Sequence, residues 1–129
     1  MPLRCLIVDD NTSFRDEMRG LLEEEGIVVV GDAASSATAV QQVARLQPDV
    51  VLVDIDLGGE SGLELARRMH EAAAPPQVIL ISTHDEREYA DLIAVSPAVG
   101  FLAKTDLSAV TIRRLLGPGV SRSDERPGR

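Results

Sequence analysis

Four aspartates follow closely on two apolar runs of the chain. Asp9 and Asp10 end the stretch "LIVDD", and Asp54 and Asp56 end the stretch "VVLVDID". Three carboxylates gathered within about 4 to 6 Å repel one another by several kcal/mol at an intermediate dielectric, so a site that contains them needs a cation. Oxygen ligands favour a hard ion, and room for water and phosphate oxygens favours Mg²⁺ over Ca²⁺. The aspartates therefore predict a metal site.

Two further residues extend this chemistry. Lys104 is the only lysine in a chain that fills its other basic positions with arginine, and Ser82 ends the run "VILIS". A metal site with an ammonium and a hydroxyl is complementary to a transferring phosphoryl group, whose oxygens need neutralising while donor and acceptor stay in line. One carboxylate must then accept the group. Asp54 is the best-placed candidate, because it ends the central strand.

The elements that position these residues are indicated by five short apolar runs that alternate with five amphipathic stretches. This is the pattern of consecutive βα units around a parallel sheet. The runs are rich in Val, Ile and Leu with little alternation, as in strands that are covered on both faces. We predict strands over 3–9, 27–31, 49–54, 77–82 and 99–103, with helices between them, the fourth over 86–95 and the fifth over 107–116.

The polar candidates all fall at one edge of this predicted sheet. In a parallel sheet the ligand crevice lies outside the carboxyl ends of the strands. The second strand ends in Asp32, a weaker signal that indicates a position away from the site. The ends of the first, third, fourth and fifth strands carry, in this order, the pair Asp9 and Asp10, then Asp54, Ser82 and Lys104.

Each candidate also has a purely structural interpretation. Asp9 or Asp10 can start the first helix, since Asp, Asn, Ser and Thr all cap helices, but capping needs only one residue and Asn11 offers another. The strand-end carboxylates can be solvated, and Lys104 can be a surface charge. Taken together, these interpretations require several polar residues to share one crevice by accident, so a functional site is favoured.

Composition limits the class of protein. The 129 residues suit one domain, and a net charge of −8 argues against binding of nucleic acid by this chain. No apolar run is long enough to cross a membrane and no signal-peptide cleavage site is present, so we expect a cytoplasmic protein without membrane contact. Cys5, the only cysteine, is expected to fill the core. Residues 117–129 are polar and rich in Gly and Pro, which predicts a disordered tail or a linker stub.

Four motifs together, "LIVDDN", "VVLVDIDLGGESG", "VILIST" and "GFLAK", resemble the receiver domain of two-component response regulators. The resemblance covers about residues 3 to 116, which assigns 1–116 to the receiver domain, and the end of the chain resembles stand-alone actinobacterial receivers. It implies a flavodoxin-like, doubly wound α/β fold with a five-stranded parallel sheet in the order 2-1-3-4-5 and helices on both faces. It also implies a phosphorelay switch that catalyses only its own phosphorylation and dephosphorylation.

The resemblance implies a role for each aspartate. Asp54 is the expected phosphoacceptor and a metal ligand. Asp10 is expected to bind Mg²⁺, or Mn²⁺ in its place, directly, and Asp9 through a water molecule. Asp56 is expected to bind the metal through its backbone carbonyl and to tune the reaction.

Five other residues follow from the same resemblance. Ser82 and Lys104 would each hold a phosphoryl oxygen, and Phe101 matches the aromatic switch position that turns inward when Ser82 moves. Thr83 replaces a frequently small residue and is expected to narrow access to the acyl phosphate. His84 matches a position that tunes hydrolysis of the phosphoryl group, with a solvated loop histidine as the alternative.

Two further positions depart from the family pattern. Thr105 follows the lysine where the family usually has proline, so a cis bond there would lack the help of proline and the loop is expected to differ. Gly58 stands where proline is common after the acceptor, which frees that loop.

The expected partners are a histidine kinase or a histidine phosphotransfer protein, an unidentified downstream protein target, and a second copy of the chain through the region of the fourth and fifth helices. Two forms of output remain alternatives: a stand-alone receiver that works by docking to its target, and a receiver cut from a DNA-binding response regulator. A docking module that has lost phosphorylation is a weaker alternative. The main rival is a haloacid-dehalogenase-like phosphohydrolase, because "VVLVDIDLGG" fits the hhhDxD signature of that family. In that family, however, the acidic pair comes after the DxD strand, whereas here Asp9 and Asp10 precede it.

Overall fold

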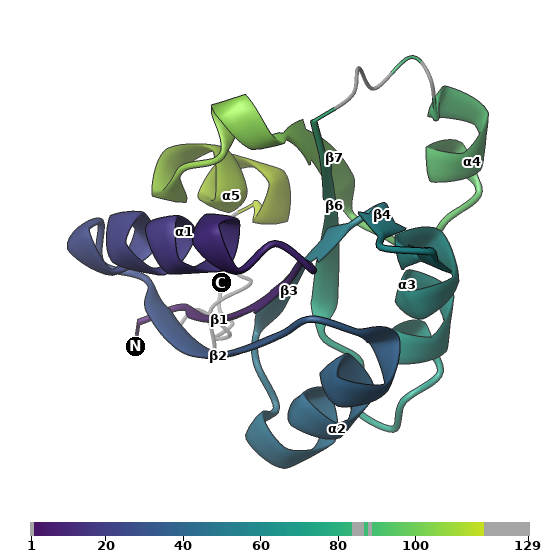
Figure 1. Ribbon diagram of the computed structural model, residues 1–129, viewed down its shortest axis with the longest axis horizontal. Helices are drawn as coiled ribbons and strands as arrows, with labels where there is room; N and C mark the ends of the chain where they lie inside the picture. Colours follow the sequence, from purple (N-terminus) through teal and green to yellow (C-terminus); the bar gives the residue numbers. More distant parts are fainter. Residues whose placement is uncertain (1, 84–86, 88, 118–129) are drawn as a thin grey trace, which may run out of the picture.

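The structure, a computed structural model, describes residues 2–83, 87 and 89–117 (Figure 1). The predictions for His84 and for the tail from residue 118 lie outside the described residues. The chain forms one parallel sheet with helices on both of its faces.

The sheet has five strands in the order β2-β1-β3-β6-β7, and all of its neighbouring strands are parallel. Strands β4 and β5 form a separate hairpin, so β6 and β7 are the fourth and fifth strands of the main sheet. The order therefore confirms the predicted 2-1-3-4-5. The strands are β1 (Arg4–Val8), β2 (Val28–Ala33), β3 (Val50–Asp54), β6 (Gln77–Ser82) and β7 (Gly100–Ala103), and the hairpin consists of β4 (Asp56–Leu57) and β5 (Glu60–Ser61). The hairpin was not predicted, because its "DLGGES" sequence has no apolar alternation.

The helices are α1 (Thr12–Glu24), α2 (Ser36–Leu46), α3 (Gly62–His70), α4 (Ala90–Ala94) and α5 (Ala109–Leu116). In Figure 1, α1 and α5 lie on one face of the sheet and α2 and α3 on the other. Side-chain oxygens of Asn11, Ser35, Ser61 and Ser108 cap α1, α2, α3 and α5 respectively, which satisfies amide groups that a helix start leaves without partners. None of the described helices has the length and apolar composition that spanning a membrane requires.

Helix α4, over Ala90–Ala94, lies within the predicted 86–95, of which residues 86 and 88 lie outside the described part of the chain. Its cap position, Tyr89, makes no side-chain capping bond, and none of its residues is fully buried. A five-residue helix therefore draws little stability from capping or burial. After β7 the chain makes a 3₁₀ turn over Lys104–Asp106, and the described residues contain no cis peptide bond.

Two apolar clusters hold the layers together, one on each side of the sheet. Met18, Leu22 and Ile112 from α1 and α5 pack on one face, and Ala39, Leu65 and Met69 from α2 and α3 pack on the other. The central strand β3 is buried along its whole length. The rigid sheet therefore fixes where its carboxyl edge lies.

Cys5 provides a direct test of this packing. Its side chain is fully buried in β1, and burial raises the pKa of the thiol to about 12. Because the thiolate is the reactive species, we expect no reaction with an aromatic disulfide reagent at pH 8 in the folded protein and complete reaction in denaturing urea. Rapid labelling of the folded chain would contradict the packing of β1.

Candidate functional site

The site lies at the carboxyl edge of the sheet, where the polar candidates meet. Asp9 directly follows β1, Asp54 ends β3, Ser82 ends β6, and Lys104 directly follows β7. Asn11, and not Asp9 or Asp10, caps α1. The capping interpretation of the acidic pair is therefore wrong.

Three carboxylates form a compact cluster. Asp9, Asp10 and Asp54 each offer one oxygen, and these three oxygens lie within 4.8 Å of one another. Asp9 is 0% exposed and Asp54 6%, whereas Asp10 is exposed. The cluster thus combines two buried carboxylates with one that faces solvent.

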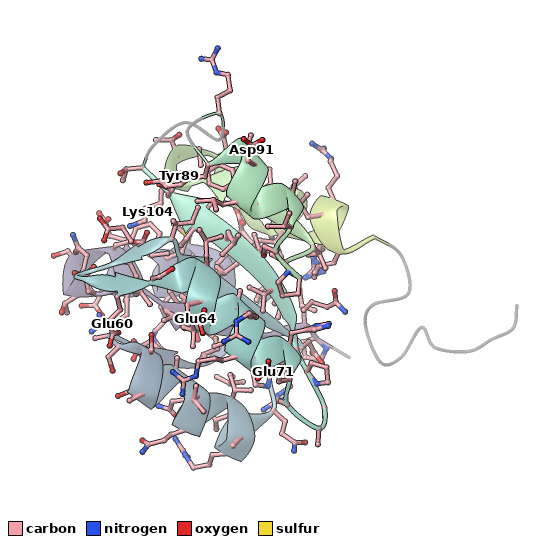
Figure 2. All side chains as sticks on the ribbon, turned by 90° about the vertical axis from the view of Figure 1, so that its right-hand side faces the viewer. Glu60, Glu64, Glu71, Tyr89, Asp91 and Lys104 are labelled. Atoms are coloured by element: carbon pink, nitrogen blue, oxygen red, sulfur yellow. The ribbon has the colours of Figure 1, made fainter. Side chains whose placement is uncertain are left out.

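Lys104 lies against the buried half of this cluster. Its Nζ is 2.5 Å from Asp9 Oδ2 and donates to Asp54 Oδ2 at 3.0 Å. The same Nζ is 4.4 Å from the centre of the Phe14 ring, within the range of a cation–π contact. In Figure 2, Lys104 lies well apart from Glu71, which follows the last turn of α3. The ammonium is therefore held by two carboxylates and an aromatic face.

The charges and donor atoms of the site fit a divalent cation. One ammonium neutralises only one of three carboxylates, so two negative charges remain in a partly desolvated edge. Within the described part of the chain, Asp9 Oδ2 is a buried oxygen without a hydrogen-bond partner, and its contact with Lys104 is an ion pair. Three oxygen donors and open solvent on the side of Asp10 suit Mg²⁺, which keeps several water ligands.

Burial and pairing shift the pKa values of the two central groups. Burial raises the pKa of the Asp54 carboxyl, while hydrogen bonds from Lys104 and from the amide of Asp56 act against that rise. Burial also acts to lower the pKa of Lys104, but its contacts with the carboxylates of Asp9 and Asp54 outweigh burial and raise it. Lys104 therefore remains a cation at neutral pH.

The two oxygens of Asp54 have different surroundings. Oδ1 accepts from the Asp56 amide at 3.0 Å, while Oδ2 accepts from Lys104. The side chain of Asp56 is exposed. Its metal-binding backbone carbonyl stays a prediction, as do the separate roles of Asp9 and Asp10.

The remaining predicted residues lie around this centre. Ser82 is 1% exposed, and its backbone pairs with Ala103. Phe101 is partly buried against the cluster on the α2–α3 face, and Thr83 is exposed. Their switching and tuning roles are not decided by this arrangement and stay predictions.

Two glycines allow the backbone to approach the acidic cluster closely. Gly58 has φ +58°, and a Cβ there would lie 2.6 Å from Asp10 Oδ2. A Cβ on Gly62 would lie 2.0 Å from the backbone oxygen of Asp54. The sequence interpretation treated Gly58 only as a source of freedom and missed Gly62, although the "GGESG" spacing marks a chain reversal there.

The fold and its acidic edge define the chain as a signal receiver domain. It belongs to the response regulator receiver domain family, whose family model matches residues 5–113. This membership favours the receiver over the haloacid-dehalogenase-like rival.

Individual relatives agree with this family. The response regulator UvrY of Escherichia coli is 33% identical over 103 residues, which are 79% of this chain and 47% of that protein. Protein-glutamate methylesterase/protein-glutamine glutaminase 5 of Myxococcus xanthus is 38% identical over 86 residues, or 66% of this chain and 25% of that protein. The chain thus spans about half or less of the length of these relatives.

A solved structure gives the same result. The receiver domain of the putative response regulator NarL from Mycobacterium tuberculosis superposes with a TM-score of 0.78 at 29% identity, covering 90% of this chain and 98% of that one.

Proposed function

We propose that the chain is a signalling switch that accepts a phosphoryl group on Asp54 from the phosphohistidine of a histidine kinase or a histidine phosphotransfer protein. The observation that carries the proposal is the position of Asp54, a buried carboxylate between an ammonium and two further carboxylates. Family membership supports it, because receiver domains of response regulators work in phosphorylation-dependent signalling.

The transfer step uses this arrangement directly. A carboxylate oxygen of Asp54 attacks phosphorus, the P–N bond of the phosphohistidine breaks, and the imidazole leaves. Lys104, 3.0 Å from Asp54 Oδ2, would stabilise charge on the phosphoryl oxygens. Mg²⁺, held by Asp9, Asp10 and Asp54, would neutralise the same oxygens when it is bound.

The output is proposed to be a change in the surface that binds a protein target. Ser82 would turn toward the phosphoryl group, and Phe101 would move into the space behind it. Both residues belong to neighbouring strands, β6 and β7, whose pairing keeps them close.

A transfer assay tests the proposed function. The chain is incubated with acetyl phosphate, or with a phosphohistidine donor, with Mg²⁺ and with EDTA in parallel. We expect one added phosphoryl group by intact mass with Mg²⁺, hydrolysed faster than a phosphoserine, and none with EDTA. A chain that remains unmodified with both donors would contradict the proposal.

Lys104→Arg separates geometry from charge. A guanidinium keeps the charge but is planar and bulkier than an ammonium, so it cannot fit between Asp9, Asp54 and Phe14 in the same way. We expect a folded protein that is phosphorylated slowly and fails to couple phosphorylation to Ser82 and Phe101.

The measurement is a pair of NMR spectra with and without beryllofluoride and Mg²⁺, where beryllofluoride stands in for the phosphoryl group. Arg67→Lys is the control, because Arg67 lies on α3 and pairs with exposed carboxylates there. Parent-like shifts around Phe101 in Lys104→Arg would contradict a specific role for the ammonium.

A further inference from the structure

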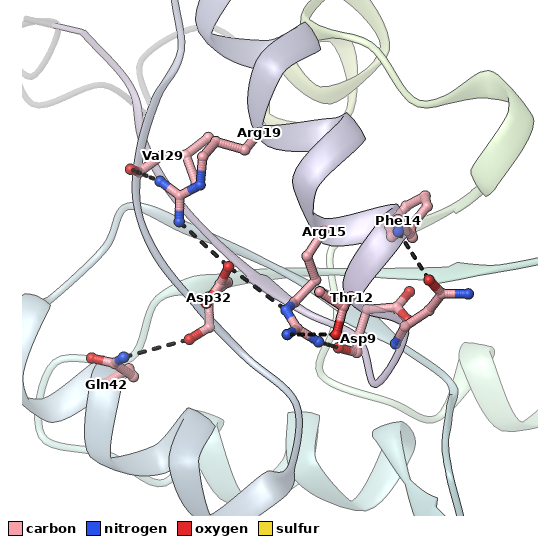
Figure 3. Close-up of polar contacts among 9 residues, drawn as sticks. Asp9, Thr12, Phe14, Arg15, Arg19, Val29, Asp32 and Gln42 are labelled. Atoms are coloured by element: carbon pink, nitrogen blue, oxygen red, sulfur yellow. Dashed lines mark hydrogen bonds and ion pairs between the residues drawn. The ribbon is translucent and has the colours of Figure 1, made fainter.

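A second cation lies on the other side of the acidic turn. Arg15, in the first turns of α1, donates from Nη1 to the backbone oxygen of Asp9 at 2.6 Å (Figure 3). Its Nη2 reaches Thr12 Oγ1 at 3.4 Å, and its buried Nε lies 3.6 Å from Asp32 Oδ2. The guanidinium thus connects the end of β1 to the end of β2.

Asp9 is held at every polar group of its backbone and side chain. Its amide donates to the Ala33 oxygen at 3.0 Å, and its Oδ1 accepts from the Asn11 amide at 2.9 Å. Lys104 pairs with its Oδ2, and Arg15 takes its backbone oxygen. Of these four contacts, the hydrogen bond from Arg15 is the one made to the peptide group that joins Asp9 to Asp10.

That peptide group decides where Asp10 points. Because a peptide is planar, fixing the backbone oxygen of Asp9 also fixes the direction in which the chain enters Asp10. Asp10 itself is exposed. A hydrogen bond on the preceding carbonyl therefore restricts the solvent-facing member of the carboxylate cluster.

Asp32, which Arg15 contacts at the end of β2, is itself held by two further residues. Asp32 also accepts from Arg19 at 3.4 Å, and its backbone oxygen accepts from Gln42 of α2 at 3.4 Å. The planar fork of arginine can serve the Asp9 oxygen and the Asp32 carboxylate together, which the single ammonium of lysine cannot do in the same geometry.

We propose that Arg15 is a positioning residue for metal binding, which orients the Asp9–Asp10 turn by linking the backbone oxygen of Asp9 to the carboxylate of Asp32. This inference rests on the proposed function, since it assumes that Mg²⁺ binds at the carboxylate cluster. Asp32, which the sequence placed away from the site, acts on the site through Arg15.

Arg15→Gln tests the inference, with Arg19→Gln as the matched control. Arg19 is on the same helix and pairs with the same Asp32, but it donates to Val29 and its side chain is 37% exposed against 14% for Arg15. Removal of groups that orient metal ligands typically weakens metal affinity by ten to a hundredfold. We expect about tenfold weaker Mg²⁺ binding in Arg15→Gln and a change within about twofold in Arg19→Gln.

Mg²⁺ affinity is measured by NMR titration of the Asp9 and Asp10 amides, at a temperature where every variant is folded. The metal-free spectra give a second readout, in which Arg15→Gln is expected to shift the Asp10 amide. Arg15→Lys keeps the charge but loses the link, so we expect it to remain clearly weaker than the parent. Asp32→Asn, which leaves Arg15 in place, is expected to weaken binding by about threefold.

The outcomes distinguish this inference from the proposed function. A parent chain whose Asp9 and Asp10 amides do not respond to Mg²⁺ would overturn both. A parent that binds Mg²⁺ while Arg15→Gln binds equally well or more tightly would overturn the inference alone. Parent-like affinity in Arg15→Lys would show that positive charge is sufficient and would overturn the proposed link.

Discussion

The Asp54→Asn protein is expected to take up no phosphoryl group in the presence of Mg²⁺, while it remains folded. Asparagine has nearly the same shape as aspartate, but its amide lacks the nucleophilic carboxylate and removes one negative charge from the cluster. Neighbouring carboxylates cannot replace it, because Asp9 is fully buried beside Lys104 and Asp10 is at the solvent side. Loss of the label should therefore be complete.

Intact mass after incubation with a phosphohistidine donor measures this result. Glu71→Gln is the control for loss of a carboxylate, because Glu71 follows the last turn of α3 and pairs with Arg67. We expect parent-like labelling in Glu71→Gln. Labelling of Asp54→Asn at the parent level would show that another residue accepts the group.

Gly62→Ala is expected to destabilise the protein by about 3 kcal/mol, because overpacking against fixed atoms costs about 1 to 3 kcal/mol and sometimes more. A Cβ at this position would lie 2.0 Å from the backbone oxygen of Asp54 and 2.9 Å from the Cα of Ile55. The Gly62 amide also donates to the Ile55 oxygen at 2.8 Å, so α3 cannot move away without losing this bond. The strain falls on the strand end that carries Asp54.

Gly20→Ala is the matched control within a helix. A Cβ on Gly20 of α1 meets no atom within 4 Å, and alanine is favoured over glycine inside helices by about 1 kcal/mol. We therefore expect a lower midpoint of urea unfolding for Gly62→Ala and an equal or higher one for Gly20→Ala. Equal stability of the two variants would contradict the close approach of α3 to β3.

Strands were the most predictable part of the fold. The apolar runs of β1, β3 and β6 are fully covered by helices, so burial and sequence composition agree. Helix α4 was predicted less well, since Leu92 is exposed and Ile93 is only partly buried against the core. The β4–β5 hairpin depends on turn geometry at Gly58 and Gly59, which hydrophobic periodicity does not report.

The site was predictable where residues end strands. Asp54 and Lys104 follow from one rule, that the carboxyl ends of parallel strands meet at one edge. Phe14 and Arg15 could not be found by that rule, because they lie on a helix and reach the site only through its orientation on the sheet. Gly62 was missed for a related reason, since a close approach between backbones leaves no polar residue to signal it.

The position of Lys104 in the chain has a consequence for folding. Its partners Asp9 and Asp54 come from β1 and β3, and the Asp54–Lys104 hydrogen bond joins residues 50 positions apart. Contacts of this kind form only after the entropy of closing the intervening loops has been overcome. Until β7 docks on β6, the buried carboxylates have no ammonium beside them and repel one another. Docking of β7 therefore completes the sheet and the site together, because it brings the ammonium of Lys104 to the carboxylates of Asp9 and Asp54.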